Sequence, residues 1–335
     1  MRGKIGFACK YVEITNSGVV SIPHLNTGST TVAWLNRQTR EVAEQRLWDL
    51  MKRNIEATHQ LVKTVGELDD HLRMVRIGSD ILPVYTHSDW SWFWRQSDVI
   101  AYAETHFAEV GRVARACNVR LSFHPGQFVV LASATEDIVN RSIEEFEYHA
   151  TMANWMGFGK SFQDFKINVH ISGRQGPEGI RRAWKKLSVE ARNCITIENE
   201  EITHGLADCL SLADIVPCVL DIHHHFIREG EYIQPDDDRV QQVIDSWRGH
   251  RPTMHYSVSR EDLLPDHPAD ILPDLGALLL AGHKKQKLRA HSDFMWNTAV
   301  NKWAGGFCDQ FDIMVEAKGK NLARDGFVKQ LTESK

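Results

Sequence analysis

The sequence predicts an α/β fold, a single-domain (β/α)8 TIM barrel that spans residues 1–335. Short apolar or β-branched runs alternate with longer amphipathic segments, which is typical of βα units around a parallel sheet. There are eight such runs, and six of them end in a residue that can ligate a metal. In a (β/α)8 barrel the functional residues gather at the carboxyl ends of the strands. The side chains that end these six runs are therefore expected to meet over one opening.

The elements can be assigned in chain order. The strands are expected at 4–9, 74–79, 120–124, 166–171, 194–199, 217–222, 252–257 and 311–317. Apolar residues return at three- and four-residue steps between several of these strands, which predicts helices over segments such as 39–65, 97–117 and 135–156. Thr39 and Thr135 stand where N-caps are expected, and Glu136 adds a carboxylate to a first helical turn.

The composition agrees with one large domain in a reducing compartment. The chain has 335 residues with 42% hydrophobic composition and shows no Ser/Gly-rich linker, repeat or low-complexity tract. The apolar run near the N-terminus is too short for a signal peptide, and no apolar stretch approaches the roughly 20 residues of a membrane helix. The six cysteines form no CxxC pair, which favours free buried thiols. We therefore expect a cytoplasmic protein that is not secreted and has no membrane partner.

Histidines and carboxylates at the strand ends predict a metal site. The candidate ligands from the strand ends are His124, His170, Glu198, Asp221, His224, His255 and Glu316. Imidazole and carboxylate donors without cysteine suit first-row divalent ions such as Zn, Mn or Fe. A carboxylate such as Glu198 or Asp221 can bridge two ions, and seven candidates exceed what one ion can use, so we expect at least two metals. Such a site supports hydrolysis or phosphoryl transfer. Sugar or polyol isomerisation on the same scaffold stays open, because residue types alone do not separate the two chemistries.

Several motifs in order carry a family resemblance. The motifs "LSFHPGQF", "ITIENE", "VLDIHHH" and "MVEAKGK", with "VRIGSDILPVYTH" upstream, resemble the ultraviolet-damage endonuclease family of barrel enzymes, which is related to endonuclease IV-type abasic-site nucleases. The resemblance runs from about residue 4 to about residue 320 and leaves a short C-terminal tail. It implies a DNA repair enzyme that cuts the phosphodiester immediately 5′ to a cyclobutane dimer or a 6-4 photoproduct, without ATP. The expected products carry a 3′-hydroxyl and a 5′-phosphate.

The resemblance also implies roles for the candidate ligands. One ion would be held by His124, His170 and Glu198, with His87 lining the site or assisting catalysis. Glu198 would bridge to a second ion held by Asp221, His255 and Glu316, and a third ion would use His224 and His291. Glu198 and Glu316 are also candidates to position or deprotonate the attacking water. The expected cofactors are two or three divalent ions, with Mn as the expected active metal and Zn or Fe as alternatives.

This chain departs from the family pattern two residues before one expected ligand. Relatives often carry a lysine two residues before the histidine that is His255 here, but this chain has Thr253. Threonine cannot replace a basic or modified lysine. Asp293, in "HSD", is a candidate to supply the missing oxygen ligand of the third ion; otherwise that site is weak or empty.

The net charge of −5 requires that DNA binding depend on local positive charge and on the bound ions. Gln127 and Phe128 follow "HPG" and resemble a Gln-Tyr wedge that probes the base stack, with phenylalanine lacking the tyrosine hydroxyl. Lys285 in "HKKQKLR" is a phosphate-contact candidate, and Lys318 is placed with the DNA-binding residues. The aromatic residues Trp92 and Phe7 either stack on DNA or pack in the protein.

The expected partner is double-stranded DNA that contains a distorting lesion. We expect a monomer that associates with the nucleoid if its host is a bacterium. An abasic-site endonuclease of the endonuclease IV type and a metal-dependent sugar isomerase remain the alternatives.

Overall fold

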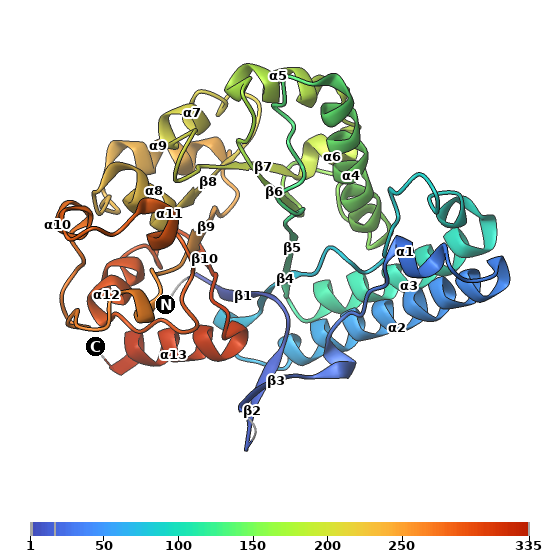
Figure 1. Ribbon diagram of the computed structural model, residues 1–335, viewed down its shortest axis with the longest axis horizontal. Coiled ribbons are helices and arrows are strands. Elements are labelled where there is room, and N and C mark those ends of the chain that lie inside the picture. Colours follow the sequence, from blue (N-terminus) through green and yellow to red (C-terminus); the bar gives the residue numbers. More distant parts are fainter. Residues whose placement is uncertain (1–2, 17, 334–335) are drawn as a thin grey trace.

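The eight predicted strands close into a parallel barrel in the computed structural model, which describes residues 3–16 and 18–333 (Figure 1). Around the barrel the order is β1, β10, β9, β8, β7, β6, β5 and β4, and β4 pairs with β1. The bounds of the barrel strands are β1 (Ile5–Cys9), β4 (Met74–Ile77), β5 (Arg120–Phe123), β6 (Lys166–His170), β7 (Ile195–Glu198), β8 (Cys218–Asp221), β9 (Thr253–Tyr256) and β10 (Asp312–Val315). The predicted TIM-barrel fold is confirmed.

The register of neighbouring strands brings their last residues to one level. His170 on β6 lies beside Glu198 on β7, and Asp221 on β8 lies beside His255 on β9. Side chains alternate between the two faces of a strand, so residues paired in this way point to the same side. The parallel register therefore gathers the predicted ligands at the carboxyl end of the barrel.

Helices cover the outside of the barrel. Thr39 caps α2 by accepting a hydrogen bond from Val42 N, as predicted, whereas Thr135 precedes α4 without a side-chain cap bond. The long helices bury an apolar stripe against the barrel, which stabilises them more than intrinsic propensity does. The α-helices are α1 (Val32–Leu35), α2 (Arg40–Gly66), α3 (Ser97–Ala116), α4 (Glu136–Trp155), α5 (Gly176–Lys186), α6 (Val189–Cys194), α7 (Leu206–Leu210), α8 (Ile222–Glu229), α9 (Asp238–Ser246), α10 (Leu275–Leu280), α11 (Lys285–Leu288), α12 (Thr298–Gly305) and α13 (Lys320–Glu333). The 3₁₀ turns are η1 (Pro23–Leu25), η2 (Asp70–Leu72), η3 (Phe93–Arg95) and η4 (Glu261–Leu263).

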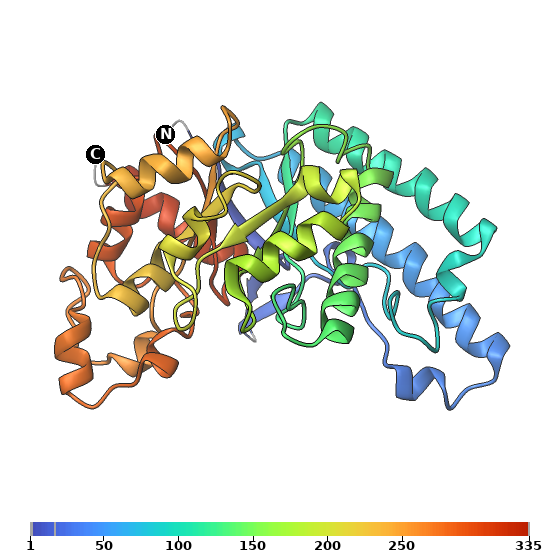
Figure 2. The ribbon, with the colours of Figure 1, turned by 90° about the horizontal axis from the view of Figure 1, so that it is seen from above.

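Two segments project from the same face of the barrel on opposite sides (Figure 2). One carries α1 and the first turns of α2, and the other carries α10. Both follow the carboxyl ends of barrel strands, α1 after β1 and α10 after β9. We call them the α1 projection and the α10 projection. They flank the barrel mouth, where the predicted ligands lie.

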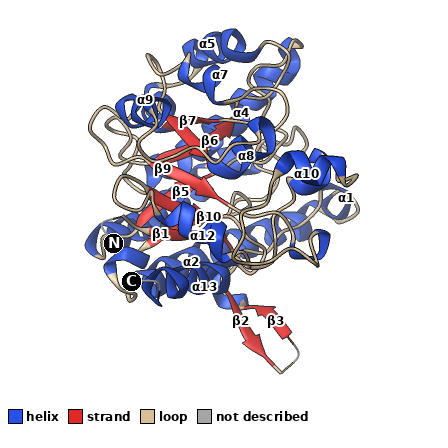
Figure 3. Ribbon diagram, turned by 90° about the vertical axis from the view of Figure 1, so that its left-hand side faces the viewer, coloured by secondary structure: helices blue, strands red, loops and turns tan. Residues whose placement is uncertain are grey.

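A two-stranded hairpin that the sequence reading missed extends beyond the barrel (Figure 3). It consists of β2 (Val12–Thr15) and β3 (Gly18–Ser21), which pair in antiparallel register directly after β1. The C-terminal segment expected to be a short tail is instead the helix α13, whose Phe327 is fully buried. This helix packs against β1 and reaches the base of the hairpin.

The amino end of the barrel holds a closed network of charges. Asp312, the first residue of β10, is 3% exposed. Its Oδ2 lies 2.6 Å from Arg120 Nη1, and its Oδ1 lies 2.9 Å from Arg251 Nε and accepts a hydrogen bond from Lys4 N. Both carboxylate oxygens are therefore paired.

The remaining expectations concern cysteines and membranes. Cys194, Cys209, Cys218 and Cys308 are buried as expected, whereas Cys9 and Cys117 are half-buried. Within residues 3–16 and 18–333, no helix has the length and apolar character needed to cross a bilayer.

Candidate metal centre

Three overlapping groups of side chains at the barrel mouth could each hold a metal ion. In each group the donor atoms lie within 4.8 Å of one another. The groups are His124 with His170 and Glu198, His124 with His255 and Glu316, and Glu198 with Asp221 and His224. Every member was expected from the sequence to be a ligand. The first group shares His124 with the second and Glu198 with the third.

Glu198 is the centre of these groups. Its carboxylate is fully buried, and its Oε2 lies 3.1 Å from His255 Nδ1 and 3.4 Å from His124 Nε2. Its Oε1 lies 3.5 Å from His224 Nδ1. One carboxylate thus faces histidines from three different strand ends, which is the arrangement that a bridging ligand needs.

A second layer of polar side chains lies below the ligands inside the barrel. Asn168 Nδ2 donates a hydrogen bond to Glu198 Oε2, and Asn168 Oδ1 accepts one from Thr196 Oγ1 at 2.8 Å. Groups that orient metal ligands in this way tune ligand geometry and metal affinity. The layer therefore fixes the orientation of the Glu198 carboxylate.

Two cations that sequence reasoning missed, the half-buried Arg76 and the buried Lys166, also contact the ligands. Arg76 on β4 donates from Nη1 to Glu316 Oε1, and Lys166 Nζ on β6 lies 2.9 Å from His255 Nε2. The signal was available, since Lys166 and His170 are four residues apart on one strand and so share a face. Lys166 also brings a lysine amine next to His255, although position 253 is a threonine.

Asp221 joins β8 to α8 and turns the histidine run toward the site. Its Oδ1 accepts a hydrogen bond from His224 N at 2.7 Å and so caps the helix. Asn199 holds the same strand end, because its side chain pairs with both the N–H and the C=O of Asp221. His225, the next residue, instead contacts Glu231 at 2.7 Å.

Burial and charge set the protonation of the site. Burial raises the pKa of Glu198, but the facing imidazoles of His255 and His170 outweigh it and hold that pKa well below its usual range. Burial lowers the pKa of His170 to about 4. Burial also opposes protonation of His224, but the Asp221 and Glu198 carboxylates raise its pKa to about 9. Burial raises the pKa of Asp221 well above its usual range.

The donor set fits divalent ions. Glu198 Oε1 and Asp221 Oδ2 are buried without a hydrogen-bond partner among the described residues. A buried carboxylate oxygen left in this way costs free energy unless a ligand satisfies it. Imidazole nitrogens and carboxylate oxygens without thiolate are donors suited to Zn, Mn and Fe. The residues therefore fit the metals expected from the sequence.

Other expected site residues lie around these groups without belonging to them. His291 lines the hollow above the site, with Nδ1 3.9 Å from Glu316 Oε2. His87 lies on an exposed turn after β4, and its Nδ1 accepts a hydrogen bond from Asp89 N at 3.2 Å. Asp293 lies on the surface, 3.0 Å from Lys318 Nζ, so the structure gives the expected substitute ligand a different partner.

A hollow of about 660 Å³ opens over the ligands, and an exposed turn forms part of its wall. Gln127 and Phe128 occupy the middle of this turn, which Val129 N closes by donating to Gly126 O at 3.0 Å. Phe128 is 86% exposed. Gln127 also lines a second hollow of about 600 Å³, on whose wall Phe128 lies. The turn therefore stands between two hollows beside the ligand groups.

The remaining expected DNA contacts differ in exposure. Of the two roles left open for Phe7, the structure shows packing in the protein, because its side chain is fully buried and packs edge-on against Tyr11. It points outward from β1 toward α13, where the Arg324 guanidinium covers its ring. Trp92 is half-buried with Arg40 over its ring at 4.4 Å, and Lys285 Nζ donates to Arg228 O at 2.7 Å.

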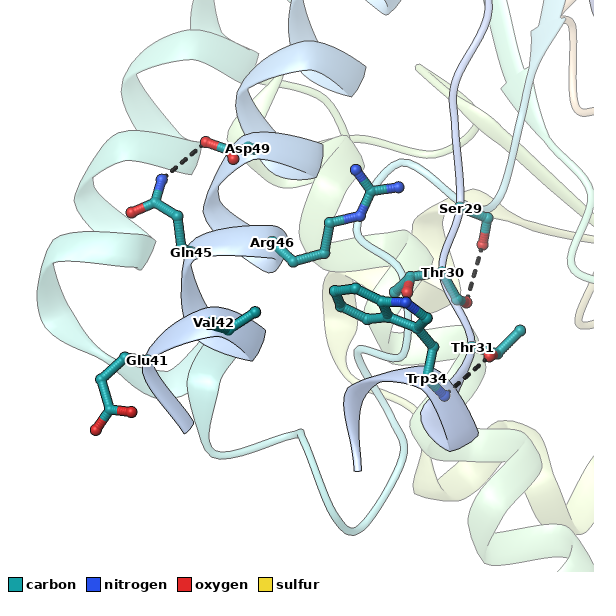
Figure 4. A pocket seen from close by; sticks show the side chains of 9 residues that line it. All are labelled: Ser29, Thr30, Thr31, Trp34, Glu41, Val42, Gln45, Arg46 and Asp49. Atoms are coloured by element: carbon teal, nitrogen blue, oxygen red, sulfur yellow. Dashed lines mark hydrogen bonds between the residues drawn. The ribbon is translucent and has the colours of Figure 1, made fainter. Parts of the chain in front are cut away.

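A larger hollow lies away from the ligands. It has a volume of about 760 Å³ and lies between α1 and the first turns of α2 (Figure 4). Trp34 faces Arg46 across it, and Gln45 pairs with Asp49 on its rim. None of the ligand groups lines this hollow, so its size does not mark the reaction site.

Known proteins match almost the whole length of this chain. The family model described as UV-endonuclease UvdE matches residues 3–334. A protein named UV DNA damage endonuclease from Bacillus thuringiensis is 25% identical over 315 residues, which cover 90% of this chain and 87% of that protein. A UV-damage endonuclease from Schizosaccharomyces pombe is 24% identical over 96% of this chain and 49% of its own length.

Solved structures share the fold. The crystal structure of SacUVDE matches with a TM-score of 0.73 and 22% identity, and covers 99% of this chain and 98% of that chain. Endonuclease IV from Thermus thermophilus matches with a TM-score of 0.54 and 15% identity, over 84% of this chain and 94% of that chain. Both likenesses support the barrel architecture described above.

Proposed function

Because this chain belongs to the UV-endonuclease UvdE family, we propose that it cuts duplex DNA immediately 5′ to distorting ultraviolet photoproducts. The family itself makes the chain a DNA repair nuclease. The finer proposal adds the position of the cut, the cyclobutane dimer and 6-4 photoproduct as lesions, and a hydrolytic reaction that uses two or three divalent ions.

The observation that carries this proposal is the overlap of the three ligand groups. Two ions that share a carboxylate lie close enough to act on one phosphodiester. Glu198 belongs to two of the groups and has its own supporting hydrogen bond from Asn168. Such a shared, oriented carboxylate supports a reaction centre with more than one metal.

We propose the ligand assignment that the family resemblance implies, in which the first set coincides with one of the three groups and His291 comes from outside them. His124, His170 and Glu198 would hold one ion; Glu198, Asp221, His255 and Glu316 a second; and His224 with His291 a third. When bound, divalent ions lower the pKa of water toward about 7 and stabilise the attacking and leaving oxygens of a phosphodiester. We propose Mn as the active ion, with Zn or Fe as alternatives.

The protein side chains orient the proposed ligands. Asn168 holds Glu198, and Arg76 holds Glu316, so both carboxylates are fixed before DNA arrives. We propose that His87 assists from the rim, because its exposed imidazole on the turn after β4 suits contact with the DNA backbone.

Lesion recognition is proposed to rest on the Gln127–Phe128 turn. An aromatic ring that is 86% exposed beside a reaction centre can enter the base stack at a weakened step. Unstacking costs a few kcal/mol and costs least for damaged bases, so the enzyme would select sites where a lesion already distorts the duplex. Divalent ions also offset part of the net charge of −5, which otherwise opposes DNA binding.

The test is incision of an end-labelled duplex that carries one thymine dimer, with purified protein and Mn. A product that ends in a 3′-hydroxyl immediately 5′ to the dimer is expected, and chelation of the metal should abolish it. Undamaged and abasic duplexes of the same sequence serve as controls.

The contrary outcomes are distinct. Cutting of the abasic duplex alone would replace the proposal with an abasic-site endonuclease. Failure to cut any duplex, by a folded protein that binds metal, would contradict a nuclease reaction altogether.

A further inference from the structure

We propose that the β2–β3 hairpin is a second DNA contact, which engages a groove of the duplex beside the lesion through the apolar pair Ile14 and Val19. This inference rests on the proposed function, since it takes lesion-bearing duplex DNA as the partner. Neither residue belongs to the ligand groups or to the Gln127–Phe128 turn.

The hairpin presents an apolar pair to solvent. Ile14 is 70% exposed and Val19 is 49% exposed, and the two are direct partners across the antiparallel strands. Directly paired residues project on the same face of the hairpin. Val12 continues this face but is buried at the hairpin base. The exposed pair is therefore the outer end of an apolar face that begins in the protein body.

The base of the hairpin is held firmly by two buried asparagines. Asn321 from α13 donates to Val12 O at 2.9 Å and accepts from Val12 N at 2.8 Å. Asn26 donates to Tyr11 O and Ile22 O and accepts from Tyr11 N. Each side chain satisfies both a backbone donor and a backbone acceptor. The ends of the hairpin are therefore fixed relative to the barrel, which limits the entropy lost when its outer part binds.

The position of the hairpin suits a duplex that crosses the barrel mouth. Strand β1 ends at Cys9, so the hairpin begins at the same end of the barrel as the ligand groups. In Figure 1 it stands at the rim between the α1 and α10 projections, which Figure 2 shows on opposite sides. A duplex that lies between these projections over the ligands passes this rim.

The composition of the hairpin favours contact with a DNA groove over contact with the backbone phosphates. Residues 11–22 contain one charged side chain, Glu13, and no lysine or arginine. They cannot neutralise phosphate, but aliphatic side chains can contact sugars and base edges or wedge between base steps. A two-stranded ribbon is also narrow enough to enter a DNA groove. The expected contact is therefore apolar and independent of salt.

The experiment compares the wild type with a double variant, Ile14→Ser and Val19→Ser. Both positions are exposed, so the fold is expected to survive, and thermal melting checks this. On a dimer duplex with long flanks we expect about tenfold weaker binding and a correspondingly higher KM, with kcat unchanged. The slope of binding affinity against salt concentration should stay the same, because no cation is removed. Shortening the duplex on the side that the hairpin reaches should erase the difference.

Val189→Ser is the matched control. Val189 is 66% exposed at the start of α6, which precedes β7 and so lies toward the opposite end of the barrel. It removes a similar exposed aliphatic group and should leave binding and KM unchanged.

Several results would overturn the inference. Equal affinity of the double variant and the wild type for the long duplex would do so, as would a changed salt slope. A wild-type dimer that becomes monomeric in the double variant would assign the pair to self-association instead. If the wild type binds the duplex but cuts none, the proposed function fails, while the binding comparison still decides the role of the hairpin.

Discussion

The two ends of the barrel hold buried charges in different ways. At the amino end, both oxygens of Asp312 are paired with Lys4 N, Arg120 and Arg251. At the carboxyl end, Glu198 Oε1 and Asp221 Oδ2 have no hydrogen-bond partner within the part of the chain that the structure describes. Both ends bury carboxylates at the tips of strands, but the carboxyl end leaves these two oxygens unsatisfied by the described residues.

This contrast separates stability from ligand binding. A buried carboxylate with a full set of partners stabilises the fold once it is formed, and breaking the set is costly. A buried carboxylate with a free oxygen is a cost that a cation can relieve. The amino end is therefore expected to determine stability, and the carboxyl end to determine metal binding and incision.

The largest expected effect is at Glu198. Glu198→Gln should lower kcat for incision by about 10³-fold, because it removes a carboxylate shared by two ligand groups. The metal-free protein should lose less than about 1 kcal/mol of stability. Incision assays, metal titration and urea unfolding measure the three quantities. A variant that unfolds while retaining metal would contradict the division between the two ends.

Asp312→Asn should give the opposite result. It breaks the amino-end network and should cost about 2–3 kcal/mol of unfolding free energy, while kcat and metal stoichiometry stay unchanged. Asp70→Asn is the control, because Asp70 pairs with Lys4 at the same end but is 65% exposed, and no measurable change is expected there. A loss of incision in folded Asp312→Asn protein would contradict the assignment of stability to the amino end and of incision to the carboxyl end.

A smaller effect is expected at Phe128, on the exposed turn that we propose recognises the lesion. Phe128→Ala should reduce the preference for damaged over undamaged duplex by about tenfold, because a stacked ring is lost. Metal stoichiometry should not change, since the ring lies outside the ligand groups. The ratio of kcat/KM for the two duplexes is the measurement, with Val189→Ala as the control. An unchanged ratio would remove the turn from lesion recognition.

The smallest expected effect concerns the protonation of a buried histidine, His149, which contrasts with that of His224. His149 on α4 is fully buried, its Nδ1 lies 2.7 Å from Glu145 O, and burial lowers its pKa to about 4. A folded state with this lowered pKa binds fewer protons than the unfolded chain. Stability is therefore present above pH 6.5 and is lost as the pH falls through 4. At the carboxyl end, by contrast, carboxylates raise the pKa of His224 to about 9.

His149→Asn should remove this contribution to the loss of stability at low pH. The loss of unfolding free energy between pH 7 and pH 5.5 should be about 1 kcal/mol smaller in the variant than in the wild type. Urea unfolding of metal-free protein at both pH values provides the measurement. Identical losses would show that burial alone does not control this histidine.

Most of the barrel could be predicted from the sequence, because each strand is a short apolar run between helical segments. The β2–β3 hairpin was missed, since its strands are four residues each and half exposed, which leaves no strong hydrophobic pattern. Helix α13 was missed because the motifs that carry the family resemblance end near residue 320. Its contacts with β1 are long-range and leave little local signal.

The ligands could be predicted because a strand end fixes where a side chain goes. Asp221 and His224 are one helical turn apart at the start of α8. The parallel register of the strands brings the other ligands to the same level. The supporting residues Arg76 and Lys166 were overlooked because a charged residue inside a strand is ordinarily expected to face solvent. Phe7 packs in the protein and does not reach DNA, because the same alternation turns its side chain away from the barrel interior. Contacts of loops depend on tertiary packing, which the sequence pattern does not encode.

The pairing of β1 with β10 has a consequence for synthesis on the ribosome. Ile5 pairs with Ile313, and the Asn321 side chain is hydrogen-bonded to Val12 309 residues earlier, so these N-terminal strands need residues that are synthesised much later. Contacts so distant in sequence form late and slow the search for the native state. Glu316 also arrives only with β10. A nascent chain therefore cannot assemble the complete reaction centre until β10 has been synthesised and has left the ribosome.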